Sequence, residues 1–237
     1  MTGLRLPRSL DDVPAAVTVI DREQLQRSPH TFADDLVRTV PDVGTFRRSS
    51  SAIADPTSQG LNLRGVGPSG VSRALVLRDG LPVNDPFGGW VYWRAMSPLG
   101  IDHVEIVPSG ASALFGNFAL GGVLQVISRP IEPRSIDALA AGGSLGTGRF
   151  AVRATDRFGK LGVALDGEAL HSSGYAPIVA AQRGDIDGRA ASTHGAGGVR
   201  LEYDLGGSTV HAAVRAFGES LDAGPSTAPR WAAVIGA

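Results

Sequence analysis

The sequence predicts two regions of different architecture: an α+β domain with a small mixed sheet and short helices over residues 1–130, and antiparallel strands over residues 131–237. Three observations support this division. Short strand-like and helix-like segments interleave before residue 130, the segment PIEP at 130–133 interrupts them, and alternation of polar and apolar residues follows. The first region lacks the regular strand and helix alternation of a doubly wound sheet, which favours the α+β class.

The first region begins with an apolar segment at residues 16–20, which predicts a strand that ends at Asp21. Asp21 can cap a short helix, and Thr31 can cap a second helix that must end before Pro41. The dipeptide Asp79-Gly80 is typical of a tight hairpin. The other expected strands are short apolar runs between turns, at 43–47, 61–64, 74–78, 81–83, 101–107 and 123–128.

The second region is dominated by alternation with a period of two, as in strands with one apolar and one polar face. In its clearest segment, 199–205, valine, leucine and tyrosine alternate with arginine, glutamate and aspartate. Connections at 157–159 and 206–207 are minimal turns, whereas 172–196 is long and polar, an alternation typical of bacterial outer-membrane barrels. The expected strands are about five, lying within 135–144, 149–155, 160–168, 199–205 and 210–215.

The composition excludes several classes of protein. The 22 basic and 23 acidic residues give a net charge of −1, so no basic surface for nucleic acid is expected. Cysteine is absent, which excludes disulfides, thiolate metal sites and cysteine nucleophiles. No segment approaches the roughly 20 apolar residues of a membrane helix, but strands that cross a membrane need only about 9 to 11 residues.

Enzymatic motifs are weak or missing. Residues 65–70 (GVGPSG) formally match a dinucleotide fingerprint, but a strand rather than a helix is expected next, and no acidic residue lies near 20 residues downstream of the motif's end at Gly70. The five histidines lack metal-ligand spacing, and Ser109 and Ser112 lie outside any nucleophile-elbow motif. Asp185 and Asp187 lack the remaining ligands of a calcium loop. We therefore expect no catalytic residue, no metal site, no cofactor and no enzymatic activity.

Several motifs of the first region occur in an order and at a spacing that carry a resemblance to a known family. They are VPAAVTVID at 13–21, ADDLVRTVPDV at 33–43, LRG at 63–65, VLRDGLPVN at 76–84, IDHVEIV at 101–107, SALFG at 112–116 and GGVLQVIS at 121–128. Together they resemble the plug domain of TonB-dependent outer-membrane receptors, which import scarce solutes into Gram-negative bacteria.

The resemblance implies a plug domain over residues 1–130 and the first strands of a transmembrane antiparallel β-barrel of roughly 22 strands over residues 131–237. It also implies localisation in the cell outer membrane, with the plug facing the periplasm. The expected partners are the energy-transducing protein TonB, outer-membrane lipid, and a small-molecule or chelate solute such as a siderophore, a cobalamin or a glycan. Nucleic acid is not an expected partner.

The resemblance further assigns roles to particular residues. The plug apex is the expected solute-binding segment, with Asp85, Phe87, Trp90, Tyr92 and Trp93 as its contacts, although the aromatic rings could instead serve packing. Arg64 is the expected contact between plug and barrel. Pro108-Ser109-Gly110 stands where the family usually has Arg-Gly-Pro, so one of the two arginines of that contact is missing.

The first three residues, Met1, Thr2 and Gly3, resemble the end of the segment that contacts TonB, and we expect them to make that contact. On this interpretation the sequence is truncated at both ends. An alternative from another class is a soluble periplasmic or secreted β-rich ligand-binding or interaction protein, whose alternating strands would pair into a sandwich around an ordinary core.

Overall fold

The structure is a computed structural model that describes residues 16–47, 49–66, 72–108, 110–222 and 230–236. The chain divides into two compact units, residues 1–129 and 130–237, and each is treated by itself below. No helix among the described residues has the length and apolar character needed to cross a membrane.

The first unit is built on a five-stranded mixed sheet in the order β1-β6-β7-β4-β5. β4 and β7 pair in parallel and the other neighbours are antiparallel. The strands are β1 (Thr18–Ile20), β4 (Ala74–Arg78), β5 (Leu81–Pro82), β6 (Ile101–Val107) and β7 (Gly122–Ser128), and a separate pair is formed by β2 (Val43–Thr45) and β3 (Leu61–Leu63). The predicted α+β class with a mixed sheet is confirmed.

The helices of this unit are short. They are α1 (Arg22–Arg27), α2 (Ala33–Val37), α3 (Ser112–Phe115) and the 3-10 turns η2 (Pro56–Ser58), η3 (Trp93–Ala95), η4 (Pro98–Gly100) and η5 (Asn117–Ala119). Asp21 caps α1 as predicted, because its carboxylate accepts from the Gln24 N–H at 2.8 Å while the Gln24 side chain accepts from the Asp21 N–H at 3.0 Å. The predicted Thr31 cap is wrong. α2 begins at Ala33, so its capping position falls on Phe32, which offers no side-chain acceptor.

The hydrophobic core of the first unit lies where the sheet meets α1, α2 and η3. Every residue of β4 is buried. Ala74 and Val76 belong to this cluster together with apolar side chains of β6 and β7, whereas Leu75 and Leu77 pack with Val123 in a second cluster. Trp93 from η3 and Val37 from α2 are among the residues that close it. Burial of this apolar surface stabilises the fold at about 25 cal/mol per Å².

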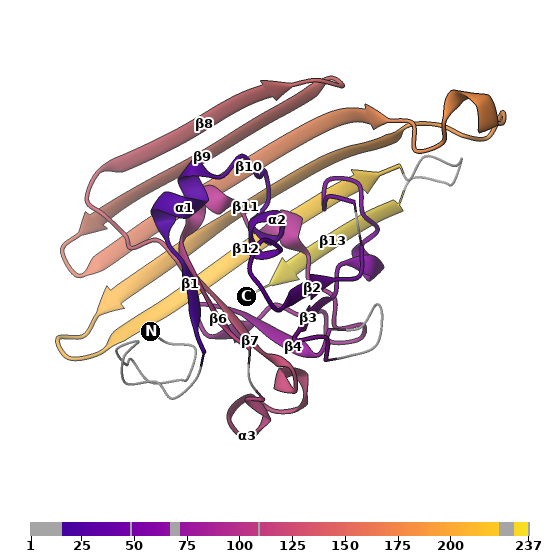
Figure 1. The fold of residues 1–237 in the computed structure, drawn as a ribbon. Coiled ribbons are helices and arrows are strands. Elements are labelled where there is room, and N and C mark those ends of the chain that lie inside the picture. The colour runs from indigo at the N-terminus through magenta and orange to yellow at the C-terminus, as the bar shows by residue number, and fades with distance from the viewer. Residues whose placement is uncertain (1–15, 48, 67–71, 109, 223–229, 237) are drawn as a thin grey trace. The chain divides into compact units, whose positions relative to one another are not determined.

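The described residues of the second unit form an antiparallel sheet whose strands follow the order of the chain, with the short helical turn η6 (Ala180–Gln182) in one connection. Its strands are β8 (Ser135–Gly143), β9 (Thr147–Phe158), β10 (Leu161–Tyr175), β11 (Ala190–Asp204), β12 (Thr209–Leu221) and β13 (Arg230–Gly236). Figure 1 shows the tight β9–β10 and β11–β12 turns at one end of this sheet and the long β10–β11 connection at the other.

Two expectations about this sheet need correction. Six strands are described where about five were expected, because β13 contains the sequence WAAVI, whose uniformly apolar residues give no period of two. The β10–β11 connection is also shorter than predicted, at residues 176–189. Serines and glycines near its ends pair through their backbone, which requires no alternation of side chains.

Candidate solute-binding site

The segment between β5 and η3 forms a loop that the Asp85 carboxylate shapes from within. One oxygen of Asp85 accepts from the backbone N–H groups of Phe87 at 2.9 Å and Gly88 at 2.8 Å. The backbone of Asp85 closes the same loop, since its N–H donates to Trp90 O at 2.7 Å and its carbonyl accepts from Gly89 N at 2.8 Å. Asp85 is thus occupied in fixing the loop rather than presented as a free charge.

Asn84 ties this loop to the central sheet, a role that no sequence pattern indicated. Its side-chain oxygen accepts from Val76 N at 2.7 Å, and its amide nitrogen donates to Gly89 O at 3.0 Å and to Ala74 O at 3.3 Å. The base of the loop is therefore bonded to a buried strand, which limits its motion.

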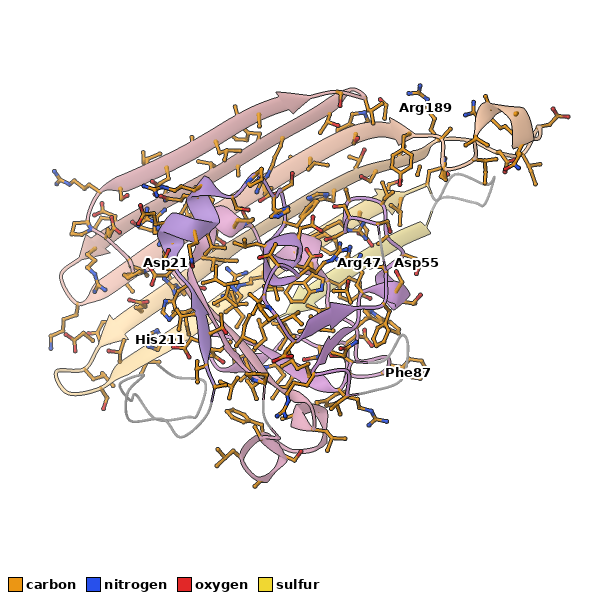
Figure 2. All side chains as sticks on the ribbon, viewed as in Figure 1. Asp21, Arg47, Asp55, Phe87, Arg189 and His211 are labelled. Carbon is orange, nitrogen blue, oxygen red and sulfur yellow. The ribbon has the colours of Figure 1, made fainter. Side chains whose placement is uncertain are left out.

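Phe87 and Trp90 occupy this loop in different ways. The Phe87 side chain is 97% exposed, and Figure 2 shows it at the tip, pointing away from the ribbon. The Trp90 ring lies on the backbone of Gly88, where a Cβ would come within 1.5 Å of it. The Trp90 Nε1–H is shielded from solvent and has no hydrogen-bond partner among the described residues. The loop thus carries one free aromatic ring and one packed ring with an unused donor.

The remaining two aromatic residues lie beyond the loop. Tyr92 is half-buried at the start of η3. Trp93 is 0% exposed, belongs to the hydrophobic core, and donates from its Nε1 to Gln59 O at 3.3 Å. The expected solute contact therefore does not hold for Trp93, because a fully buried ring has no surface to offer. The structure brings Asp85, Phe87 and Trp90 together and separates Trp93 from them.

Arg94 of η3 belongs to a buried polar network that no sequence motif indicated. Arg94 Nη1 donates to Ser51 O at 2.7 Å, and the Ser51 hydroxyl donates to Asp34 at 2.6 Å. Asp34 also forms an ion pair with Arg47. Burial, and then the charge of Arg94, lower the pKa of Arg47 to about 10, so that Arg47 remains charged at neutral pH. The network fixes the loop 46–55 to α2 and η3.

Arg64 has a positive φ of 58° at the end of β3, and its side chain is exposed. Its Nη1 donates to Pro108 O at 3.1 Å, so it bonds the segment where the family pattern has its second arginine. Of the GVGPSG motif only residues 65 and 66 are described, and the next described element is the strand β4. Met1, Thr2 and Gly3 lie outside the described residues.

The sheet of the second unit has two chemically distinct faces. One face carries ionic side chains that pair across strands: Arg149 binds Glu168 with two bonds of 3.0 and 3.2 Å, and Arg157 contacts Glu202 at 3.1 Å. The other face exposes large apolar side chains, among them Phe150, Leu165, Val199, Leu201, Val210 and Val214. Exposed apolar residues on one whole face are unusual for a sheet surrounded by water.

Known proteins match both units. The family described as TonB-dependent receptor plug domain matches residues 9–123. The rhizobactin receptor of Rhizobium meliloti (strain 1021) is 32% identical over 132 residues, which cover 54% of this chain and 16% of the receptor. The ferric enterobactin receptor PirA of Pseudomonas aeruginosa is 28% identical over 124 residues, covering 48% of this chain and 16% of that protein.

Among solved structures, the siderophore receptor PirA from Acinetobacter baumannii matches with a TM-score of 0.68 at 20% identity, over 86% of this chain and 32% of that one. The chain thus spans about a sixth of the length of the curated relatives and a third of the solved chain. The structural match includes the antiparallel strands that follow the plug. This chain therefore carries the plug domain of a TonB-dependent receptor over residues 9–123, followed by antiparallel strands of the kind found in solved receptors of that family.

Proposed function

We propose that the chain acts in the uptake of a siderophore-type solute across the outer membrane, as the plug and the first barrel strands of a TonB-dependent receptor. The named relatives are a rhizobactin receptor and a ferric enterobactin receptor. The observation that carries the proposal is the pairing of a plug domain with a sheet that is ionic on one face and apolar on the other.

On this proposal the apolar face of β9 to β12 lies against lipid and the ionic face lines the interior of the barrel. A membrane-spanning strand has no water on its outer face, so its outward side chains must be apolar, while its backbone groups are bonded to neighbouring strands. Phe150, Leu165 and Leu201 would then face lipid, and Glu168 and Glu202 the interior. The periplasmic partner would be TonB, with Met1, Thr2 and Gly3 as its contact, and Arg64 would contact the barrel.

We propose the loop of residues 85–90 as the solute contact, with Phe87 and Trp90 as its binding residues, Tyr92 beside them and Asp85 as the residue that holds its shape. Flat aromatic rings bind large amphipathic chelates through apolar area, which Phe87 exposes fully and Trp90 exposes in part. Because Asp85 and Asn84 fix the loop before a solute arrives, little ordering would be needed on binding.

The test is solute binding by the receptor that contains this chain, purified from outer membranes in detergent. Ferric catecholate, ferric hydroxamate and ferric citrate chelates, cyanocobalamin and an oligosaccharide are titrated while tryptophan fluorescence is recorded. We expect one ferric chelate to bind, and Phe87→Ala to weaken it by about tenfold, the effect of losing roughly 1.4 kcal/mol of contact. Phe158→Ala, which removes an exposed ring of the second unit, is the matched control.

Three results would count against the proposal. If none of the ferric chelates binds saturably, the assignment of the solute class is wrong. Equal affinity of the parent and Phe87→Ala would remove the loop as the site. Recovery of the protein in the soluble periplasmic fraction without detergent would favour the alternative, a soluble β-rich interaction protein.

A further inference from the structure

The residues that connect the two units are held by side chains of β9. The connector is defined here as residues 130–132. Three side chains spaced two apart along β9 donate to its backbone carbonyls: Arg153 Nη2 to Pro130 O, Thr155 Oγ1 to Glu132 O and Arg157 Nε to Ile131 O, each at 2.8 Å. Residues two apart in a strand point to the same face, so one face of β9 presents a row of donors to one stretch of backbone.

The same stretch is also packed against β10. The Ile131 side chain is only 3% exposed. It lies over Gly162, where a Cβ would come within 3.2 Å of Ile131 Cγ2 and 3.5 Å of Ile131 Cβ. Gly162 is the register partner of Arg157. The missing side chain at Gly162 therefore leaves the space that Ile131 fills, next to the guanidinium that binds its carbonyl.

The chain before the connector is held just as closely within the plug. Ser128 makes two bonds to Asp79: its N–H donates to Asp79 Oδ1 at 2.8 Å and its hydroxyl donates to Asp79 Oδ2 at 2.7 Å. The Arg129 N–H donates to Gly100 O at 3.0 Å, and Arg129 is buried. Pro130 fixes its own φ and restricts Arg129 to extended conformations. No residue from 128 to 132 is therefore left without a restraint.

We propose that the connector and its three β9 donors form a clamp that keeps residues 130–132 bound to the first barrel strands throughout the transport cycle. A loose linker would detach from β9 whenever the plug moves. A clamped connector instead requires that any rearrangement which opens a path for solute takes place before Pro130, while residues 130–132 stay on β9. Arg153, Thr155 and Arg157 are positioning residues in this device. Its role in transport rests on the proposed function, whereas the clamp itself does not.

The first experiment measures the clamp in the resting protein. The 237 residues of this chain contain no cysteine, so Ile131→Cys introduces a single thiol into them, and in a receptor with no other reactive thiol its rate of reaction with a maleimide reports exposure of the connector. We expect slow labelling in this background and at least about tenfold faster labelling when Arg153→Ala, Thr155→Val and Arg157→Ala are added, since local opening sets the rate. Glu202→Gln is the matched control, because it removes the ion pair of Arg157 but leaves every donor to the connector.

A second variant distinguishes opening of the connector from unfolding of the triple variant. Gly162→Leu places a side chain in the space of Ile131 and leaves the donors intact, so it too is expected to speed labelling of the thiol at position 131 while the strand signal in circular dichroism stays at the parent value. Labelling of the parent at the rate of the urea-unfolded protein would overturn the clamp. So would an unchanged rate in both the triple variant and Gly162→Leu.

The second experiment locks the clamp. The distance of 3.5 Å between the Ile131 Cβ and an ideal Cβ at Gly162 suits a disulfide, so Ile131→Cys with Gly162→Cys should cross-link on oxidation. We expect the oxidised receptor to import its ferric chelate at the rate of the reduced one. Import that stops on oxidation and returns on reduction would overturn the proposed role, because the connector would then have to move. A parent receptor that imports no solute refutes the proposed function, while the labelling result still decides the clamp.

Discussion

Asp34 in α2 and Arg47 in the loop after β2 form an ion pair that is buried inside the plug domain. The Ser51 hydroxyl and the second guanidinium, Arg94, complete the network around it. Asp34 is the carboxylate of this network and contacts both Arg47 and the Ser51 hydroxyl, so its loss leaves the buried charge of Arg47 without this partner.

Asp34→Asn should therefore destabilise the plug by about 3 kcal/mol, since removal of one partner leaves a buried charge unpaired. Asp35→Asn is the matched control: Asp35 is half-buried, contacts the more exposed Arg38 at 3.4 Å and accepts from the Ser50 hydroxyl at 3.0 Å, a bond that the asparagine oxygen can also accept, so the change should cost less than about 1 kcal/mol. Urea unfolding followed by tryptophan fluorescence measures both, because Trp93 lies in the same core. Equal destabilisation by the two changes would contradict this account.

A second prediction concerns pH. A bulge in the β6–β7 pairing after Ile101 brings Asp102 and His103 together, and the His103 ring lies between two carboxylates, 2.8 Å from Asp102 and 3.4 Å from Glu105. The hydrogen bond to Glu105 is the largest cause that raises the pKa of His103, and the bond and charge of Asp102 add to it, while burial opposes them. A neutral imidazole has one donor only, so both contacts are favourable only in the charged ring.

The sign of the effect follows from the raised pKa. A base whose pKa is higher in the folded state stabilises that state fully below its unfolded value of about 6.5, and this stabilisation is lost as the pH rises through the folded value. His103→Gln should thus lower the unfolding free energy more at pH 5 than at pH 9. His30→Gln, which alters an exposed histidine, is the control. A larger loss at pH 9 than at pH 5 would refute the arrangement.

A third prediction tests the two faces of the second sheet. Leu201 is exposed on the apolar face, and its neighbour Glu202 points to the opposite face, where it pairs with Arg157. If the apolar face meets lipid, Leu201→Arg should cost roughly 2 to 4 kcal/mol at mid-membrane depth and reduce the amount of receptor in the outer membrane. Glu202→Gln should leave that amount unchanged. Equal amounts of both variants in the outer-membrane fraction would count against a lipid-facing surface.

A fourth prediction concerns the shape of the loop at residues 85–90. Any side chain at Gly88 would overlap the Trp90 ring, so Gly88→Val must displace that ring. Solute affinity should fall by about tenfold, as expected for the loss of roughly 1.4 kcal/mol of contact, while the amount of receptor in the membrane stays the same. Gly207→Ala, in the turn between β11 and β12, has open space around it and is the control. An unchanged affinity in Gly88→Val would show that Trp90 takes no part in binding.

Features that depend on neighbouring residues were predictable from the sequence. Asp79 and Gly80 both have positive φ, 51° and 85°, as a tight hairpin turn requires, and Asp21 forms the expected cap. Alternation in the second region located five of its six described strands. In each case the signal and the structure it specifies lie within a few residues of each other.

Features that depend on tertiary contacts were not predictable. Arg47 and Asp34 give no sequence signal because the fold alone brings them together. In the sequence, Trp93 belongs to the aromatic segment of the plug apex, but η3 directs its side chain into the hydrophobic core. Arg153, Thr155 and Arg157 fit the alternating pattern of a strand, in which they are simply residues of the polar face. Their spacing therefore gives no sign that they bind the connector, residues 130–132.

The topology of the two sheets has a consequence for the order in which they can form. In the plug, Thr18 pairs with Ile106 and Ala74 pairs with Gly122, so its sheet cannot assemble until almost the whole domain is available. Each of these pairings also closes a long loop at a cost in chain entropy. The second sheet consists of consecutive hairpins, each of which can close once its own two strands exist. The plug, although synthesised first, is thus expected to fold more slowly than the strands that follow it.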